Sequence, residues 1–282
     1  MRKRIIIAIL LIFQALNLTS QDLIQKATKT LEYRFEDCTS MLIQGEKATI
    51  RIRGKSQSVV ELKILLVAKH KNPKIALNDL KHIRFVSEKD GTQLNLKNFY
   101  ERANRKIESN LSVVYELTVP ENIVFQLNNL YGSVTLMNLT GSKSVDISFG
   151  RIDMQNISGI TNLQLKYTNL TAQNIAGKLT GDLSKSDAVI THCGATTDLN
   201  MKYGVLKATL TSDCEQIRVT GIRTEVNLQT PASDYNLDLK TIYSEVEVFD
   251  KVVTPTYRWN SKSSPKSIFV TTTYCPIKIK LK

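Results

Sequence analysis

Three adjacent side chains near the C-terminus have the chemistry of a recognition site: Tyr257, Arg258 and Trp259, the last being the only tryptophan among 282 residues. Aromatic and guanidinium groups dominate the binding energy of many interfaces because they combine a large apolar surface with polar contacts. These three are therefore the predicted binding residues, for a glycan or a protein partner. The alternative is structural, with Trp259 folding over one end of the protein as a cap.

Two carboxylates could instead support sugar hydrolysis or elimination. Asp146 and Asp182 are separated by two periods of the repeat described below, which corresponds to about 9.6 Å in stacked strands. Inverting glycosidases hold their carboxyl groups about 6.5–9.5 Å apart, so this spacing lies at the outer limit. We predict no catalytic residues, and a polysaccharide lyase or hydrolase is the alternative.

The thiols and imidazoles show no metal-binding pattern. No two cysteines follow a C-x-x-C spacing, and the histidines are scattered. The four cysteines leave three disulfide pairings open. We predict no metal and no cofactor. The residues concerned are Cys38, Cys193, Cys214, Cys275, His70, His82 and His192.

The segment 1–20 forms a predicted secretory signal peptide. Three basic residues at positions 2–4 precede an apolar stretch from Ile5 to Leu18, and Ser20 supplies a small residue before the cleavage point. Elsewhere no segment approaches the length of apolar chain that spans a bilayer. We therefore expect an exported protein, periplasmic, on the cell surface or secreted, with no transmembrane segment after cleavage.

The chain carries a formal net charge of +12. Positive charge outside the cytoplasm suits anionic surfaces, although a solvated basic surface is the simpler interpretation. Lysines and arginines do not gather in runs with interleaved aromatic residues, which nucleic-acid grooves require. No nucleic-acid partner is expected.

The segments that would position these groups repeat. YGSVTL at 131–136 is echoed by FGRIDM at 149–154 and YTNLTA at 167–172. So steady a period indicates stacked repeats. The apolar anchor of each copy recurs at a nearly constant interval, at Val134, Ile152, Leu170, Val189, Leu206, Val226 and Val246.

A second apolar pair follows each anchor, as at Val145 and Ile147. Two short strands per repeat cannot bury their apolar faces alone, whereas stacking the repeats about 4.8 Å apart buries them in one continuous core. The predicted fold is all-β, a single-stranded parallel β-helix (solenoid) with coils of about 18 residues. Residues 121–282 form the solenoid, with an insertion near 251–266, and residues 21–120 form a strand-rich lead-in and N-terminal cap.

Two kinds of corner residue have predicted roles. Asn138, Asn156 and Asn174 recur at equal spacing, one in each of three successive copies, so stacking would let each amide bond to the next in an Asn ladder. The aromatic residues that open the copies continue the inward alternation of the preceding strand, and we predict that they stack inside the core. They are Tyr131, Phe149, Tyr167, Tyr203 and Tyr243.

Together these features resemble a known family. YELTVP at 115–120 leads into NLYGSV at 129–134, and the coils that follow carry Tyr-Gly and Asn-x-x-Gly corners. These motifs are similar to those of the bacterial adhesin-like β-solenoid proteins of the head GIN domain type. The resemblance covers most of residues 30–282, implies a right-handed parallel β-helix on an exported protein, and brings no catalytic residues.

The sequence thus favours an exported, non-catalytic, adhesin-like binding or scaffold protein. Its repetitive surface would be presented to a surface glycan or a protein partner, because repeated flat faces favour many weak contacts over one tight site. The enzyme named above is the alternative.

Overall fold

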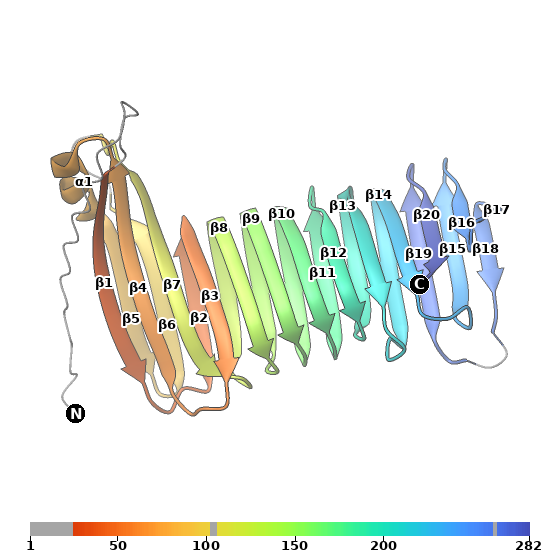
Figure 1. The fold of residues 1–282 in the computed structure, drawn as a ribbon, viewed down its shortest axis with the longest axis horizontal. Helices are drawn as coiled ribbons and strands as arrows, with labels where there is room; N and C mark the ends of the chain where they lie inside the picture. Colours follow the sequence, from red (N-terminus) through yellow and green to blue (C-terminus); the bar gives the residue numbers. More distant parts are fainter. Residues whose placement is uncertain (1–24, 102–105, 262–263) are drawn as a thin grey trace.

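The computed structural model describes residues 25–101, 106–261 and 264–282, and within these ranges the protein is an elongated all-β structure (Figure 1). Twenty strands and one helix are found there, and the strands are joined in one network of pairings. The all-β prediction is confirmed. The predicted signal peptide, residues 1–20, lies outside the described residues.

The middle of the structure is a stack of strands that turn a corner partway along their length. Up to β13, neighbours pair in parallel and are offset by one repeat, so Val134 lies beside Ile152 and Ile152 beside Leu170. Equivalent residues of successive repeats therefore form rows. The strands are β8 Val124–Leu139, β9 Lys143–Ile157, β10 Ile160–Ile175, β11 Lys178–Ser184, β12 Ala188–Cys193, β13 Thr196–Leu210 and β14 Gln216–Thr230.

The corner divides these pairings into two ladders. The first ladder joins the strand portions before the corner and the second ladder joins those after it. Val145 and Ile147 of the first ladder and Ile152 and Met154 of the second are all buried and belong to one core cluster. The two ladders therefore enclose a common core, as the alternation of apolar residues predicts.

The N-terminal part extends both ladders. β2 pairs in parallel with β8 before the corner and β3 pairs with β8 after it, so β2 and β3 act as one more repeat. Beyond them, β6 and β5 end the first ladder, and β7, β4 and β1 end the second. The elements are β1 Gln25–Phe35, β2 Ser40–Glu46, β3 Ala48–Lys55, β4 Val60–His70, α1 Pro73–Leu80, β5 Ile83–Asp90, β6 Gln93–Tyr100 and β7 Asn110–Pro120.

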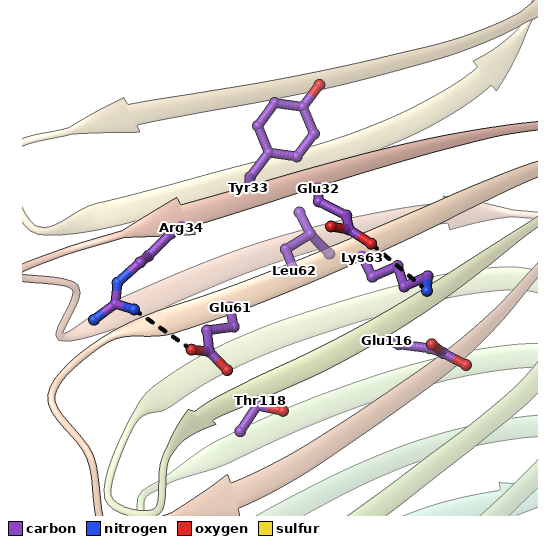
Figure 2. Close-up of a pocket in the computed structure, with 8 residues that line it drawn as sticks. All are labelled: Glu32, Tyr33, Arg34, Glu61, Leu62, Lys63, Glu116 and Thr118. Atoms are coloured by element: carbon purple, nitrogen blue, oxygen red, sulfur yellow. Dashed lines mark ion pairs between the residues drawn. The ribbon is translucent and has the colours of Figure 1, made fainter. Parts of the chain in front are cut away.

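The outward face of β1, β4 and β7 carries charges of alternating sign (Figure 2). Arg34 pairs with Glu61 at 3.8 Å and Lys63 with Glu32 at 3.6 Å, across a shallow depression of about 480 Å³. All four side chains are at least half exposed, so each pair contributes at most about 1 kcal/mol. Because these cross-strand charges satisfy one another, this depression is not our candidate site.

The C-terminal strands are not stacked in sequence order. β14 pairs with β19 and β20 instead of with the strand that follows it, so Val226 lies beside Ile277, and Ile277 beside Val246. β18 and β17 then pair antiparallel with β15 and β16 and end the two ladders. The strands are β15 Asn236–Ile242, β16 Val246–Val248, β17 Lys251–Val253, β18 Thr256–Trp259, β19 Ser267–Thr273 and β20 Ile277–Leu281.

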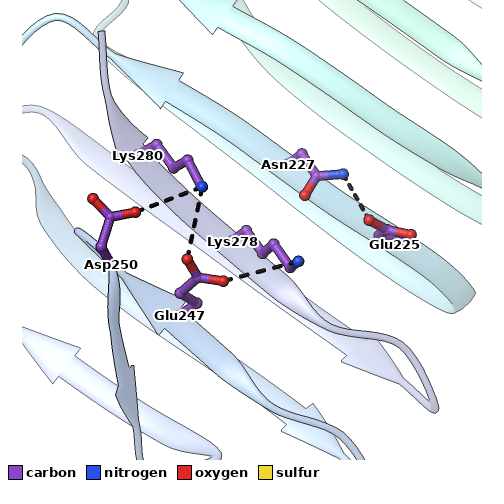
Figure 3. Close-up of polar contacts among 6 residues, drawn as sticks. All are labelled: Glu225, Asn227, Glu247, Asp250, Lys278 and Lys280. Atoms are coloured by element: carbon purple, nitrogen blue, oxygen red, sulfur yellow. Dashed lines mark hydrogen bonds and ion pairs between the residues drawn. The ribbon is translucent and has the colours of Figure 1, made fainter.

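The expectation that the anchors Val226 and Val246 are neighbours is therefore wrong. Val246 and Ile277 both fill inward positions and both are fully buried, so burial of apolar surface does not choose between the two orders. The outward charges fit the observed one, because Glu247 of β16 lies 3.9 Å from Lys278 and 3.8 Å from Lys280 of β20 (Figure 3). If β16 lay next to β14 instead, the Glu247 carboxylate would face Asn227, which carries no charge.

One predicted anchor is displaced by one position. Leu170 pairs with Ala188, and both Ala188 and Ile190 are buried, whereas Val189 is 41% exposed. The step from Leu170 to Ala188 therefore equals the step from Ile152 to Leu170, and the period continues unchanged. Val189 was mistaken for the anchor because the residue at the inward position is small.

The predicted Asn ladder is confirmed. The Asn156 amide donates to the Asn138 side-chain oxygen at 2.8 Å, and the Asn174 amide donates to Asn156 at 2.9 Å. All three residues have φ between 54° and 56°, a left-handed conformation that asparagine adopts more readily than most residues.

Lys143 occupies an inward position and is only 2% exposed. Its ammonium donates to the Ser158 carbonyl at 2.6 Å, and burial lowers the pKa of the amine to about 8 from 10.5. Between pH 8 and 10.5 the unfolded chain binds a proton that the folded protein does not bind. Folding stability therefore rises with pH across this window.

This pH dependence should disappear in Lys143→Met. Relative to that variant, we expect the free energy of unfolding of the wild type to increase by about 3 kcal/mol between pH 7 and pH 10.5. Urea denaturation at both pH values measures the difference, and other titrating groups contribute equally to the two proteins. Equal pH slopes would contradict the burial of the ammonium.

Candidate functional site

A line of exposed residues, the corner column, follows the corner between the two ladders. From β8 onward it takes one residue from each successive repeat, and each has a positive φ of 51–65°. In spatial order, set by the flanking strand pairings, the column consists of Tyr131, Phe149, Tyr167, Lys185, Tyr203, Arg223, Tyr274 and Tyr243.

The aromatic rings of the corner column are exposed, and the prediction that they lie in the core is wrong. Four of the five predicted rings are 41–49% exposed and Tyr243 is 78% exposed. Strict alternation holds only for extended backbone. The left-handed residue at the corner turns the chain, so Phe149 points outward while Ile147 before it and Ile152 after it are both buried.

Neighbouring rings in the column stack on one another. The ring centroids of Tyr131 and Phe149 are 5.1 Å apart, those of Phe149 and Tyr167 are 5.0 Å apart, and those of Tyr274 and Tyr243 are 5.1 Å apart. The angles between ring planes are 7–20°. Such offset stacking contributes about 0.5–1.5 kcal/mol per pair beyond the burial of area.

Two cations complete the corner column where rings are missing. Lys185 donates a hydrogen bond to the Tyr167 hydroxyl at 2.7 Å, which lowers the pKa of that phenol and raises the pKa of the ammonium. The Arg223 guanidinium lies 5.6 Å from the ring of Tyr203 and 5.7 Å from that of Tyr274. Neither cation was predicted as a site residue, although Lys185 lies midway between Tyr167 and Tyr203 in the chain, one period from each.

This geometry limits what the corner column can bind. Stacked neighbours cover ring faces in much of the column, so those faces are not free to receive sugar rings. The exposed parts are ring edges, phenol hydroxyls and the two cations. The column therefore offers hydrogen-bond donors, positive charge and apolar edges along the corner, and it contains no carboxylate.

The predicted binding residues Tyr257, Arg258 and Trp259 lie on β18, at the end of the first ladder. Tyr257 packs against the core, Arg258 pairs with Asp238 at 3.3 Å, and Trp259 is 52% exposed. β18 thus covers the end of β15 and also presents Trp259 to solvent. The structure places these three residues on one strand and separately from the corner column.

The predicted carboxylate row follows the outward face of the first ladder. The Gln164 amide donates to Asp182 at 2.8 Å, and the Asn200 amide donates to the other oxygen of Asp182 at 3.1 Å. Asn200 pairs with Thr220, so the row continues to Thr220, whereas Arg218 and Asp238 lie in the adjacent row. Both oxygens of Asp182 are held by neighbouring repeats.

The described residues contain no group of three or more histidine, cysteine or acidic side chains placed to hold a metal ion. All four cysteines are free thiols, and burial raises the pKa of Cys214 to about 12. Within the described part of the chain, no helix has the length and apolarity needed to cross a membrane.

Neither the protein-family models nor the curated proteins include a match to this chain. Several solved structures are similar to it. One is "a putative adhesin" from Bacteroides fragilis, with 13% identity, a TM-score of 0.35, and coverage of 90% of this chain and 97% of that one. Another is "a putative adhesin" from Parabacteroides merdae, with 10% identity, a TM-score of 0.33, and coverage of 89% and 95%.

A third is "a putative cell adhesion protein" from Clostridium sporogenes, with 14% identity, a TM-score of 0.29, and coverage of 91% and 100%. All three are described as putative adhesins or putative cell adhesion proteins. At these values the likeness assigns no ligand to this chain.

Proposed function

We propose that this is an exported, non-catalytic, adhesin-like binding protein whose two ladders form a parallel β-helix, and that it presents its corner column to a surface polymer or a protein partner. The observation that carries the proposal is the exposure of six rings and two cations in one line. Monomeric proteins rarely expose contiguous apolar groups without a binding role.

Repetition supports many weak contacts rather than one pocket. Successive strands of the stack are about 4.8 Å apart, so an extended ligand would meet an equivalent group in each repeat. Joined contacts of this kind raise the overall affinity through effective concentration. A non-catalytic role is supported by the lack of carboxylates in the corner column and by the hydrogen bonds that occupy Asp182.

The test replaces two exposed rings, Tyr203→Asn and Tyr243→Asn, because asparagine keeps the left-handed backbone. Beads coated with the protein are applied to arrays of glycans and of extracellular proteins. We expect binding that falls at least tenfold in this double variant, while the control Val189→Asn on the second ladder binds as the wild type does. Absence of binding to every arrayed molecule, or binding that both variants retain, would contradict the proposal.

A second variant tests the C-terminal segment in the same assay. Replacing Tyr257, Arg258 and Trp259 together by alanine should leave binding intact if the corner column is the contact surface. Loss of binding in this variant alone would place the site on β18. A large fall in the melting temperature would show that β18 acts as the cap of the stack.

A further inference from the structure

A second surface carries groups of different chemistry. A shallow depression of about 490 Å³ lies on the outward face of the first ladder, over β9, β10, β11 and β13. Its lining carries two carboxylates, Asp146 and Asp182, and two lysines, Lys166 and Lys202, with the uncharged polar residues Ser148, Gln164, Ser184 and Asn200 between them. The depression adjoins the corner column, since Tyr167 and Tyr203 follow directly after the two lysines.

One side of the depression is lined by hydrogen-bonding groups held in fixed orientations. The amides of Gln164 and Asn200 each donate to Asp182, at 2.8 and 3.1 Å. A carboxylate has about four acceptor positions, so Asp182 can still accept from hydroxyl groups, and the two amides retain free donors and acceptors. This side suits a ligand rich in hydroxyls.

The other side is cationic. Lys166 and Lys202 flank Ser184 at the same register position of three neighbouring strands. Two strand spacings, about 9.6 Å, therefore separate the two lysine positions. The ion pairs among the described residues include neither lysine. Both are exposed, so both charges are available to an anionic group.

We propose that this depression binds an acidic polysaccharide. Its carboxylate groups would pair with Lys166 and Lys202, and its hydroxyls would bond to the row of Gln164, Asp182 and Asn200. A neutral glycan would leave both ammonium groups without a partner, and a peptide made of glutamate residues would bring no hydroxyls to the row. This inference deepens the proposed function, since it names the class of polymer that such a binding protein recognises.

The test measures binding of galacturonate oligosaccharides to the full chain by titration calorimetry. Lys166→Gln with Lys202→Gln should weaken binding at least tenfold. The matched control, Lys207→Gln with Lys240→Gln, removes the same charge from two other exposed lysines and should change binding less than twofold. Neutral malto-oligosaccharides should not bind.

Three results would overturn the inference: no binding of the acidic oligosaccharide, equal losses in the two double variants, or equally tight binding of polyglutamate, which would show attraction by charge alone. These outcomes leave the proposed function untouched if bead adhesion still depends on the corner column. Conversely, lysine-dependent binding with no effect of the corner variants would reject the column and retain this site.

Discussion

Replacing Ile152 by aspartate should prevent the protein from folding. Ile152 is fully buried and lies between Val134 and Leu170 in the second ladder. A carboxylate at this position would have apolar neighbours from the repeats on both sides and no cation to pair with. The cost of burying an unpaired charge exceeds about 4 kcal/mol, a large fraction of the stability of a typical domain.

The matched control is the next residue, Asp153→Ala. Asp153 points outward and pairs with Arg151 at 2.9 Å, and exposed pairs of this kind contribute at most about 1 kcal/mol. Soluble yield and urea denaturation should therefore separate the two variants clearly, with Asp153→Ala within about 0.5 kcal/mol of the wild type. Similar losses in both would mean that the register of the stack is wrong.

Deleting residues 264–282 should also unfold residues 236–259, which the deletion leaves in the chain. The deletion removes β19 and β20, which lie between β14 and the pair β15 and β16. Residues 236–259 would lose their parallel neighbours and their share of the core. Hydrogen exchange followed by mass spectrometry should then show these residues exchanging at the rate of unfolded chain.

The control is the longer deletion of residues 231–282. It leaves β14 as the last strand, and we expect β8 to β13 to keep their protection from exchange in both truncated proteins. If strands were stacked in sequence order, the shorter deletion would remove only the outermost repeat. Protection of residues 236–259 in the shorter protein would therefore contradict the inserted position of β19 and β20.

The repeat could be predicted because its period is nearly constant and its anchors alternate with polar residues. Val134, Ile152 and Leu170 are evenly spaced along the chain, so one register satisfies them all. The same spacing exposed the Asn ladder, which depends on nothing outside the repeat. Ala188 was not predicted as an anchor because a small residue indicates an inward position less clearly than the larger Val189 beside it.

The N-terminal part has the same spacing of apolar residues, although no repeat was predicted there. Ile43 precedes Ile50 by the same interval that separates Leu127 from Val134 and Val145 from Ile152. The structure confirms that β2 and β3 act as a repeat. Pairs of apolar residues at this spacing would have identified it.

Two other features, one of the candidate site and one of the fold, cannot be predicted from the alternation of apolar and polar residues. Phe149 points outward because its own backbone is left-handed. Counting alternate positions as inward and outward assumes that every residue is extended. The order of the C-terminal strands depends on which of two equivalent apolar repeats reaches β14. The apolar pattern does not distinguish them, because Val246 and Ile277 fit the same inward position.

The antiparallel strands at both ends of the stack have a consequence for assembly. A stack of parallel repeats has two complementary ends, and copies could join head to tail without closing, which is the geometry of a fibre. Here β17 and β18 end one side, and β1 and β5 end the other, each running against its neighbour. In the first ladder β5 and β18 run against the stack, whereas in the second ladder β17 runs against it and β1, antiparallel to β4, runs with it. Copies joined head to tail would therefore meet antiparallel edges at the second ladder and could not continue the parallel register there.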